Sequence, residues 1–400
     1  MIDAAFSPKV HTFERPTRHH ALLVAPGGAW LASAEGQMLI QSHVDDAALW
    51  EAEADGFRHV VSGASLRARP GSAAGSVRLS SGDADLGEDG APGAAADFTV
   101  SHGPEKRPSE YLAEFRETGW VAIACVLDPE IVEGLQRLGG VDGYEGAGEV
   151  PRERQITDGP ALSRATLEPV SLWLCRQYMR VSDIKLGHPP AVTALTPDDG
   201  ERIVQGWHGD FPYMWGSDRS AAAYRVPPGA DELVLGIQRN ICVSDFRVDN
   251  GATVFCLASH GAHAVPPVEW GRSRDTRRPG HRAEHGLPYA GEGTDVIEAP
   301  AGTIILYDAR IWHRAGVNRT NRRRGAIIQA VTAGFIIPFF DNTQPFRRWL
   351  ASDVPAQLNE RERREFEDLM LHRIVGPQGV FAIAPDAELT ERVRAHGVAY

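Results

Sequence analysis

The sequence predicts an α+β protein in which a β-sandwich or jelly roll is backed by helices. Two observations predict this class. Amphipathic helical segments come first, between about residues 108 and 180, and a long series of short apolar strands bounded by turn residues follows from about residue 190. A separate group of short strands precedes the helices, so a small all-β segment is expected in front of the main domain.

The first 70 residues consist of short apolar runs separated by Gly, Pro and Asp at close spacing, which is typical of a meander of β-hairpins. We expect strands over 21–24, 29–32, 37–41, 49–52 and 58–61. Residues 1–70 are therefore interpreted as a small N-terminal all-β lobe. Such a lobe is incomplete alone, so we expect it to pack on the main domain or on a second copy of the chain in a homodimer.

Residues 71–107 are rich in Gly, Ala, Ser and Asp and are interpreted as a linker, although 77–79 and 98–100 have the composition of short strands. The main domain is expected over 108–400. Its helices are predicted from an N-cap at Ser109, from Asp128 with Pro129 at the first helical position, over 163–180, and over 345–371. Its strands are predicted over 120–125, 191–195, 202–210, 233–243, 252–257, 295–299, 303–307 and 325–333.

Composition limits the classes of partner. The chain has 41 basic and 53 acidic residues, a formal net charge of −12, which argues against general binding to nucleic acid or to an anionic membrane. No apolar run approaches the ~18 residues of a membrane span, and the N-terminus has no signal-peptide pattern. The four cysteines have no CxxC spacing and are interpreted as reduced core thiols. We expect a cytoplasmic protein that acts on a small molecule.

Two short segments carry the pattern of a metal site. His208 and Asp210 are two residues apart, a spacing that puts both side chains on one face of a strand, and His313 ends a later apolar strand. Two imidazoles and one carboxylate, with half of the coordination sphere open, form the facial triad of non-haem Fe(II) oxygenases. Arg324 follows on what is predicted as the next strand, and its planar fork suits a carboxylate cosubstrate. The other His-x-Asp pair, His43 with Asp45, lies in a polar turn and is interpreted as surface.

The segments around these residues resemble the phytanoyl-CoA dioxygenase family of Fe(II)/2-oxoglutarate-dependent oxygenases. The resemblance rests on Phe-Arg-Glu-Thr-Gly-Trp-Val-Ala-Ile from residue 115, Trp-His-Gly-Asp from residue 207, Asp-Asn-Gly-Ala-Thr from residue 249 and Leu-Tyr-Asp-Ala-Arg-Ile-Trp-His from residue 306. It extends from Tyr111 to about Ala333, and it implies that the core is a double-stranded β-helix, the jelly-roll or cupin-like arrangement, backed by helices. The chain departs from the family at Cys-Leu-Ala before Ser259, where members more often have Pro-Gly, and in its N-terminal β segment, which typical members lack.

The resemblance implies roles for particular residues. His208, Asp210 and His313 would be the catalytic iron ligands, Arg324 would pair with the distal carboxylate of 2-oxoglutarate, and Thr253 would donate a hydrogen bond to the same cosubstrate. It implies Fe(II), 2-oxoglutarate and O₂ as the reactants that accompany the substrate. The expected reaction is hydroxylation of an unactivated C–H bond in a small secondary metabolite or lipid-like molecule, with release of succinate and CO₂, as in natural-product biosynthesis.

Three alternatives stay open. The same iron chemistry can give desaturation, cyclisation or epimerisation, depending on how the substrate lies. The same ligands can hold zinc in a non-oxidative enzyme in which Arg324 grips a carboxylate substrate. The chain can also be a metal-free binding module on a β-sandwich. The carboxylate of Asp210 occupies the place that a halide would need, so halogenation is disfavoured.

Two further segments allow either a functional role or an ordinary structural one. The aromatic residues Phe211, Tyr213 and Trp215 directly follow the first metal segment and would line the substrate pocket or pack against a helix. The loop over 268–292 carries several arginines together with Gly and Pro, so it would be a lid over an anionic substrate or simply a solvated loop.

Overall fold

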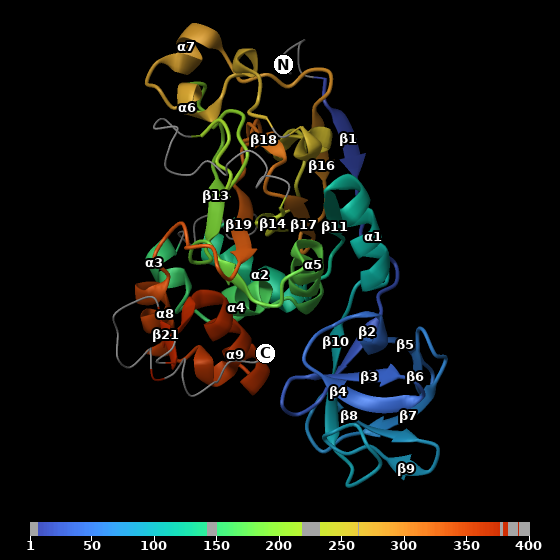
Figure 1. Ribbon diagram of the computed structural model, residues 1–400. Helices are drawn as coiled ribbons and strands as arrows, with labels where there is room; N and C mark the ends of the chain where they lie inside the picture. The colour runs from blue at the N-terminus through green and yellow to red at the C-terminus, as the bar shows by residue number, and fades with distance from the viewer. Residues whose placement is uncertain are drawn as a thin grey trace.

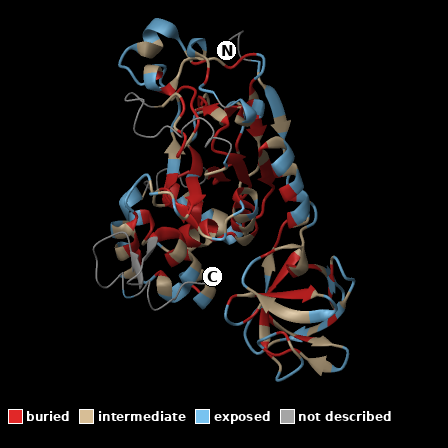
Figure 2. Ribbon diagram, viewed as in Figure 1, coloured by how far each residue is buried: buried red, intermediate tan, exposed pale blue. Residues whose placement is uncertain are grey.

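The computed structural model describes residues 7–141, 150–217, 233–262, 264–376, 379–382 and 391 of the 400-residue chain. Helices and two sheets form the main body, and a separate β lobe lies at one end of it (Figure 1). Buried residues are concentrated in the strands of the main body and in the inner strands of the lobe (Figure 2). In these described residues no helix combines the length and the apolar character that crossing a membrane requires.

The lobe is one antiparallel sheet with strand order β10-β8-β7-β6-β5-β2-β3-β4, in which β9 pairs with β8 and β10 also pairs with β2. Its strands are β2 (Ala21–Val24), β3 (Trp30–Ala34), β4 (Gln37–Gln41), β5 (Leu49–Glu53), β6 (Gly56–His59), β7 (Ser65–Pro70), β8 (Ser76–Ser81), β9 (Ala84–Asp85) and β10 (Asp97–His102), with a 3-10 turn at Asp46–Ala48. The β10–β2 pairing closes the strands from β2 to β10 into a ring, with β3 and β4 continuing beyond β2, and Leu23, Trp50 and Phe98 share one apolar core.

The lobe therefore extends beyond residue 70. Residues 71–107 were expected to be a linker, but β8, β9 and β10 pair into the sheet there, because Leu79 and Phe98 supply buried apolar side chains that the Gly- and Ala-rich composition conceals. The lobe also packs on the main body: the guanidinium of Arg361 lies 4.4 Å from the ring centroid of Trp30. The division of the chain into domains stays a prediction.

The first strand of the chain does not belong to the lobe. β1 (Lys9–Thr12) pairs in parallel with β16 (Asp295–Glu298) and forms the edge of a sheet in the main body with the order β1-β16-β15-β18. The other strands of this sheet are β15 (Val254–Cys256) and β18 (Trp312–Arg314). A 2.9 Å contact between His11 Nε2 and an oxygen of Asp295 fixes β1 on its neighbour.

The second sheet of the main body has the order β11-β17-β14-β19-β12, with β13 also paired to β19. Its strands are β11 (Trp120–Ile123), β17 (Ile304–Asp308), β14 (Gly236–Cys242), β19 (Arg324–Ala333), β12 (Ile184–Leu186) and β13 (Val192–Leu195). The alternation of side chains gives this sheet two different faces. One face carries Ile237, Ile241, Leu306, Ile327 and Val331, which pack in the same apolar cluster as the helices.

The opposite face of this sheet is called the inner face below, and it carries the polar side chains that lie near the candidate site. Register pairs Gln238 with both Tyr307 and Ala330, and pairs Asn240 with Ile305 and Ile328, so these side chains share the inner face. Arg324 lies on the same face because it is an even number of residues from Ala330 along β19.

The helices that cover the other face are α1 (Pro108–Thr118), α2 (Pro129–Gly139), α4 (Ala161–Thr166) and α5 (Pro169–Met179), followed near the C-terminus by α8 (Thr343–Leu350) and α9 (Glu360–Met370). The remaining short elements are α3 (Arg152–Gln155), α6 (Ser273–Thr276), α7 (His281–His285), 3-10 turns at Leu257–Gly261, Val268–Trp270 and Pro355–Gln357, and the hairpin β20 (Arg373–Gly376) with β21 (Gly379–Ala382).

Three expected elements differ in detail. The helix expected over 163–180 is two helices, because Glu168 caps the second one and Pro169 occupies its first position. Helix α1 begins at Pro108, and Ser109 donates to Asp46 in the lobe instead of capping the helix. The strand expected over 202–210 does not form, and only Trp207 and His208 make isolated bridges there.

Candidate metal centre

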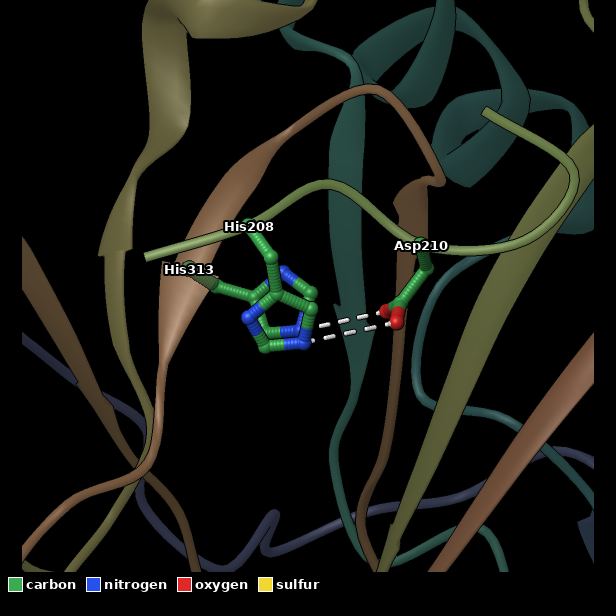
Figure 3. A group of neighbouring side chains, drawn as sticks. All are labelled: His208, Asp210 and His313. Carbon is green, nitrogen blue, oxygen red and sulfur yellow. Dashed lines mark ion pairs between the residues drawn. The ribbon is translucent and has the colours of Figure 1, made fainter. Parts of the chain in front are cut away.

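Three side chains from distant parts of the chain converge next to the inner face. His208, Asp210 and His313 each offer one ligand atom, and these atoms lie within 4.8 Å of one another (Figure 3). Asp210 Oδ1 is 3.7 Å from His208 Nε2, and Asp210 Oδ2 is 3.1 Å from His313 Nε2. The two imidazole centroids are 4.3 Å apart. The two imidazoles and the carboxylate therefore face one small volume.

Backbone pairing places these residues. The N–H of His208 donates to the carbonyl of His313 at 3.0 Å, and the N–H of His313 donates back at 2.9 Å, so the two segments form an antiparallel bridge beside β18. The N–H of Asp210 then donates to the carbonyl of Ala309 at 2.7 Å. Asp210 is thus held by the turn between β17 and β18, not by the strand that the His-x-Asp spacing predicted.

The tautomers of both imidazoles suit a metal. His208 Nδ1 lies 2.8 Å from the carbonyl of Gly206, and His313 Nδ1 lies 3.1 Å from that of Ile311. A carbonyl only accepts, so both Nδ1 atoms carry the hydrogen, and both Nε2 atoms are left to bind a metal. His208 Nε2 lies 3.0 Å from the amide nitrogen of Gln205, and His313 Nε2 faces the buried Oδ2 of Asp210. Two imidazole nitrogens and a carboxylate oxygen around one small volume are the donor set of a divalent metal ion, whose place a proton on one imidazole can take.

Electrostatics in the metal-free protein agree with this arrangement. Burial, with the nearby His313, lowers the pKa of His208 to about 4, so this imidazole is neutral near pH 7. Burial acts in the same direction on His313, but the Asp210 carboxylate outweighs it and raises the pKa of His313 above its usual value. The two imidazoles in turn hold the pKa of Asp210 below its usual value despite burial. A proton on His313 is therefore the cation that a metal would displace.

A buried tyrosine stands behind the carboxylate. The ring of Tyr307 is 1% exposed, and its centroid lies 5.2 Å from that of His313. Burial and the negative charge of Asp210 raise the pKa of this phenol well above its usual value, while the Asn240 amide opposes the shift. The phenol therefore stays neutral and can donate toward the Asp210 carboxylate, with the amide of Asn240 on its other side.

An ion pair braces the turn that carries Asp210 and His313. Both oxygens of Asp308 accept from Arg310, at 2.9 Å from Nε and 2.6 Å from Nη2, and the hydroxyl of Tyr178 donates to Asp308 at 3.0 Å. The side chain of Asp308 is fully buried and that of Arg310 is 8% exposed. Between them lies Ala309, whose carbonyl holds Asp210, so the pair fixes the spacing of the candidate ligands.

Arg324 begins β19 on the inner face, as its predicted position on the strand after His313 required. Its Nη2 donates to the carbonyl of Gly251 at 2.8 Å, its guanidinium carbon lies 4.4 Å from the ring centroid of Phe246, and its Nε is buried with no acceptor. In the described part of the chain no acidic side chain pairs with it, and burial lowers its pKa to about 10. A buried guanidinium without a carboxylate partner is suited to an anionic ligand. Thr253, half-buried, lies just before β15 and two residues from Gly251.

The three aromatic residues after Asp210 go to different places. Phe211 reaches the inner face: a Cβ added to Gly187 would meet its ring at 3.5 Å and the Cβ of Ala330 at 3.0 Å. Tyr213 and Trp215 instead share an apolar cluster with Ala309. The structure thus gives Tyr213 and Trp215 a packing role and leaves Phe211 as the candidate pocket residue.

The loop over 268–292 contains two short helices, α6 and α7. Its Arg282 makes a two-armed ion pair with Asp198, 2.7 Å at each arm, so this arginine is already neutralised. The lid role stays a prediction.

Several residues at the site had no signal in the sequence reasoning. Gln238, Asn240 and Tyr307 lie inside apolar strand segments, and only alternation along those strands would have put them on one face. His188 is also close enough to feel the Asp210 charge, and burial lowers its pKa.

Comparison with known proteins gives a family. The family model described as phytanoyl-CoA dioxygenase (PhyH) matches residues 115–326, more than half of the chain, and this range contains all three converging residues and Arg324. A search of the curated proteins gave no significant match. Among solved structures, the non-heme alpha ketoglutarate dependent epimerase SnoN from nogalamycin biosynthesis is 21% identical, covers 57% of this chain and 83% of its own, and has a TM-score of 0.37. The same epimerase in complex with Fe3+, alpha ketoglutarate and nogalamycin RO is 19% identical, covers 57% and 84%, and has a TM-score of 0.38. Similarity at this level decides neither the fold nor the reaction of this chain.

Proposed function

This chain belongs to the phytanoyl-CoA dioxygenase family of Fe(II)/2-oxoglutarate-dependent oxygenases, and from that premise we propose that it hydroxylates an unactivated C–H bond of a small molecule. Members of the family use Fe(II), 2-oxoglutarate and O₂. The observation that supports the proposal most is the convergence of His208, Asp210 and His313, whose ligand atoms lie within 4.8 Å of one another in a buried site. The co-products would be succinate and CO₂.

In this proposal the three converging residues hold Fe(II), which supplies the activation of O₂ when it is bound together with the 2-oxo acid. The chain's own contribution is positioning. The carbonyls of Gly206 and Ile311 keep both Nε2 lone pairs directed at one point, and Tyr307 orients the carboxylate of Asp210.

Arg324 would bind the distal carboxylate of 2-oxoglutarate, and Thr253 would donate to the same molecule. Arg324 is four residues along β19 from Ile328, which lies opposite Asn240, so at the usual strand rise it is ~13 Å from that position. The arginine side chain and a five-carbon diacid can together bridge this separation. Phe211 would exclude water on the substrate side. Its ring would also hold the substrate so that the reacting C–H bond is the one nearest the metal.

A succinate-release assay distinguishes the proposed oxygenase from the zinc enzyme. The protein would be prepared without metal, loaded anaerobically with Fe(II) and 2-oxoglutarate, and screened with candidate substrates by succinate release. We expect release that requires both Fe(II) and O₂ and that is absent from Asp210→Ala. No O₂-dependent succinate release from the Fe(II)-loaded protein with any candidate, together with conversion of a substrate by the Zn(II)-loaded protein, would contradict the oxygenase proposal and favour the zinc alternative.

Labelled oxygen then distinguishes outcomes of the same iron chemistry. Hydroxylation transfers one atom of ¹⁸O₂ into the product, whereas desaturation, cyclisation and epimerisation leave the product without the label. The metal-free binding module makes a different prediction, since His208→Ala would then leave ligand binding unchanged.

Two structural expectations accompany the function as proposals. The two sheets of the main body, with the candidate site beside the inner face, are consistent with the jelly roll that the sequence predicted. A homodimer remains a prediction, which light scattering on the full chain would test.

A further inference from the structure

One buried carboxamide on the inner face has an oxygen with no partner. Gln238 is 4% exposed, and its Oε1 is buried without a hydrogen-bond donor. Leaving such an acceptor unpaired destabilises the fold, so a native structure keeps it only for a reason. Every other residue of β14 is also buried. In the described structure this acceptor therefore waits for a donor.

Register places Gln238 next to the candidate metal centre. It lies directly between Tyr307 on β17 and Ala330 on β19, with all three side chains on the inner face. Tyr307 is the residue behind Asp210, and Ala330 lies beside the ring of Phe211. Gln238 is therefore flanked by the residue behind Asp210 on one side and by the residue beside Phe211 on the other.

Gln238 and Arg324 lie at separate positions along the inner face. The order along β19 is Arg324, Ala326, Ile328 and then Ala330, so Asn240 lies between Gln238 and the arginine. The cosubstrate that Arg324 binds would occupy the Asn240 side, and the substrate would lie on the Gln238 side.

Exposed apolar side chains lie next to Phe211. The segment from Phe335 to Phe340 follows β19 and exposes large apolar side chains: Phe335 is 71% exposed, Ile337 74% and Phe340 57%. The ring of Phe339 is 5.5 Å from that of Phe211, so the exposed segment is continuous with the inner face. Large apolar groups exposed next to a candidate catalytic centre are typical of a ligand-binding surface.

We propose that Gln238 is the specificity-determining residue for the substrate, and that its carboxamide oxygen accepts a hydrogen bond from a hydroxyl or N–H group of an otherwise apolar molecule lying over Phe211 and Phe339. The substrate class is thus an uncharged, mainly hydrocarbon compound with at least one donor group. This inference rests on the proposed function, because it takes the metal and 2-oxoglutarate to occupy the other side of the centre.

The test uses the full chain loaded with Zn(II) and 2-oxoglutarate, so that binding is measured without turnover. The probes are indan-2-ol, indane and indane-2-carboxylate, which share one apolar framework, and their dissociation constants are measured by ligand-observed NMR. We expect indan-2-ol to bind ~3- to 10-fold more tightly than indane, the usual contribution of one hydrogen bond, and the carboxylate to bind most weakly.

Variants locate the effect. Gln238→Leu and Gln238→Met should remove the preference for indan-2-ol and leave the affinity for indane within about twofold, since the second keeps the length of the side chain. Gln177→Met, on the exposed surface of α5, should leave the preference unchanged. Phe340→Ser should weaken both indane and indan-2-ol to a similar degree.

The outcomes are distinguishable. If the wild type takes up Zn(II) and 2-oxoglutarate but shows no preference for indan-2-ol, or if the preference persists in both Gln238 variants, the inference is overturned while the proposed function stands. Tightest binding of the carboxylate overturns it as well. If the wild type binds neither Zn(II) nor 2-oxoglutarate, the proposed function itself fails.

Discussion

His208 and His313 are hydrogen-bonded to each other through their backbones in both directions, at 3.0 and 2.9 Å, while their imidazoles lie 4.3 Å apart on the side of Asp210. The site geometry is therefore carried by backbone pairing that needs no metal. Two ligands are already in place before a cation arrives, and only a proton has to leave.

This pairing predicts that the metal stabilises a preformed fold. At a free Fe(II) or Zn(II) concentration 100 times the dissociation constant, the free energy of unfolding should rise by ~2.7 kcal/mol. His208→Ala should remove this gain but leave the metal-free protein folded. Urea unfolding with and without metal measures both quantities, and a metal-free wild type that is unfolded would contradict the prediction.

Arg324 should determine affinity for 2-oxoglutarate. Arg324→Leu removes the buried guanidinium, and a charge-assisted hydrogen bond of ~1.5–3 kcal/mol corresponds to a ~10- to 100-fold loss of affinity. Arg324→Lys should lose nearly as much, because lysine lacks the planar fork. Calorimetric titration of 2-oxoglutarate into the metal-loaded protein measures this. Arg322→Leu, at an exposed neighbouring position, is the control and should bind normally.

Tyr307→Phe should weaken metal binding and leave the fold intact. The change removes only the phenolic hydroxyl that faces Asp210 and keeps the ring. Loss of a group that orients a metal ligand typically costs ~10–100-fold in metal affinity. Competition with a chelating dye gives the dissociation constant for Zn(II), so activity is not needed. Unchanged affinity would mean that the phenol does not orient the carboxylate.

Arg310→Met should lower stability and loosen the site together. It leaves the fully buried Asp308 without its cation, which for a buried pair costs ~3–5 kcal/mol. The carbonyl of Ala309 would lose its fixed place, so affinity for Zn(II) should fall as well. The matched control is Arg364→Met, which breaks an exposed pair with Glu360 and should cost less than ~0.5 kcal/mol.

Stability should fall as the pH drops below neutral. Burial and the nearby Lys185 lower the pKa of His372 to about 4, against about 6.5 in the unfolded chain. A histidine whose folded pKa is lowered stabilises the fold above its unfolded pKa, and this contribution is lost as the pH falls from about 6.5 toward 4. At pH 5 the loss is at most about 2 kcal/mol. Urea unfolding at pH 7.5 and pH 5 should show a smaller difference for His372→Gln than for the wild type.

The sequence determined the chemistry of the candidate site. The His-x-Asp pair, the strand-ending His313 and Arg324 on the following strand each have a side chain whose type limits what it can bind. These are local facts, and strands β17 and β19 formed where apolar alternation predicted them. The family resemblance rested on the same segments and is confirmed by the match over residues 115–326.

Only the tertiary structure decided what surrounds that chemistry. Which face of β14 Gln238 and Asn240 occupy depends on register with β17 and β19, and a shift of one residue would turn both side chains away from the metal. The place of Asp210 depends on its backbone hydrogen bond to Ala309, about 100 residues along the chain, and β1 pairs with β16 of the main body instead of with the N-terminal lobe. Pairings of this kind join residues far apart in the chain, so their free energy is not written in any local pattern of the sequence.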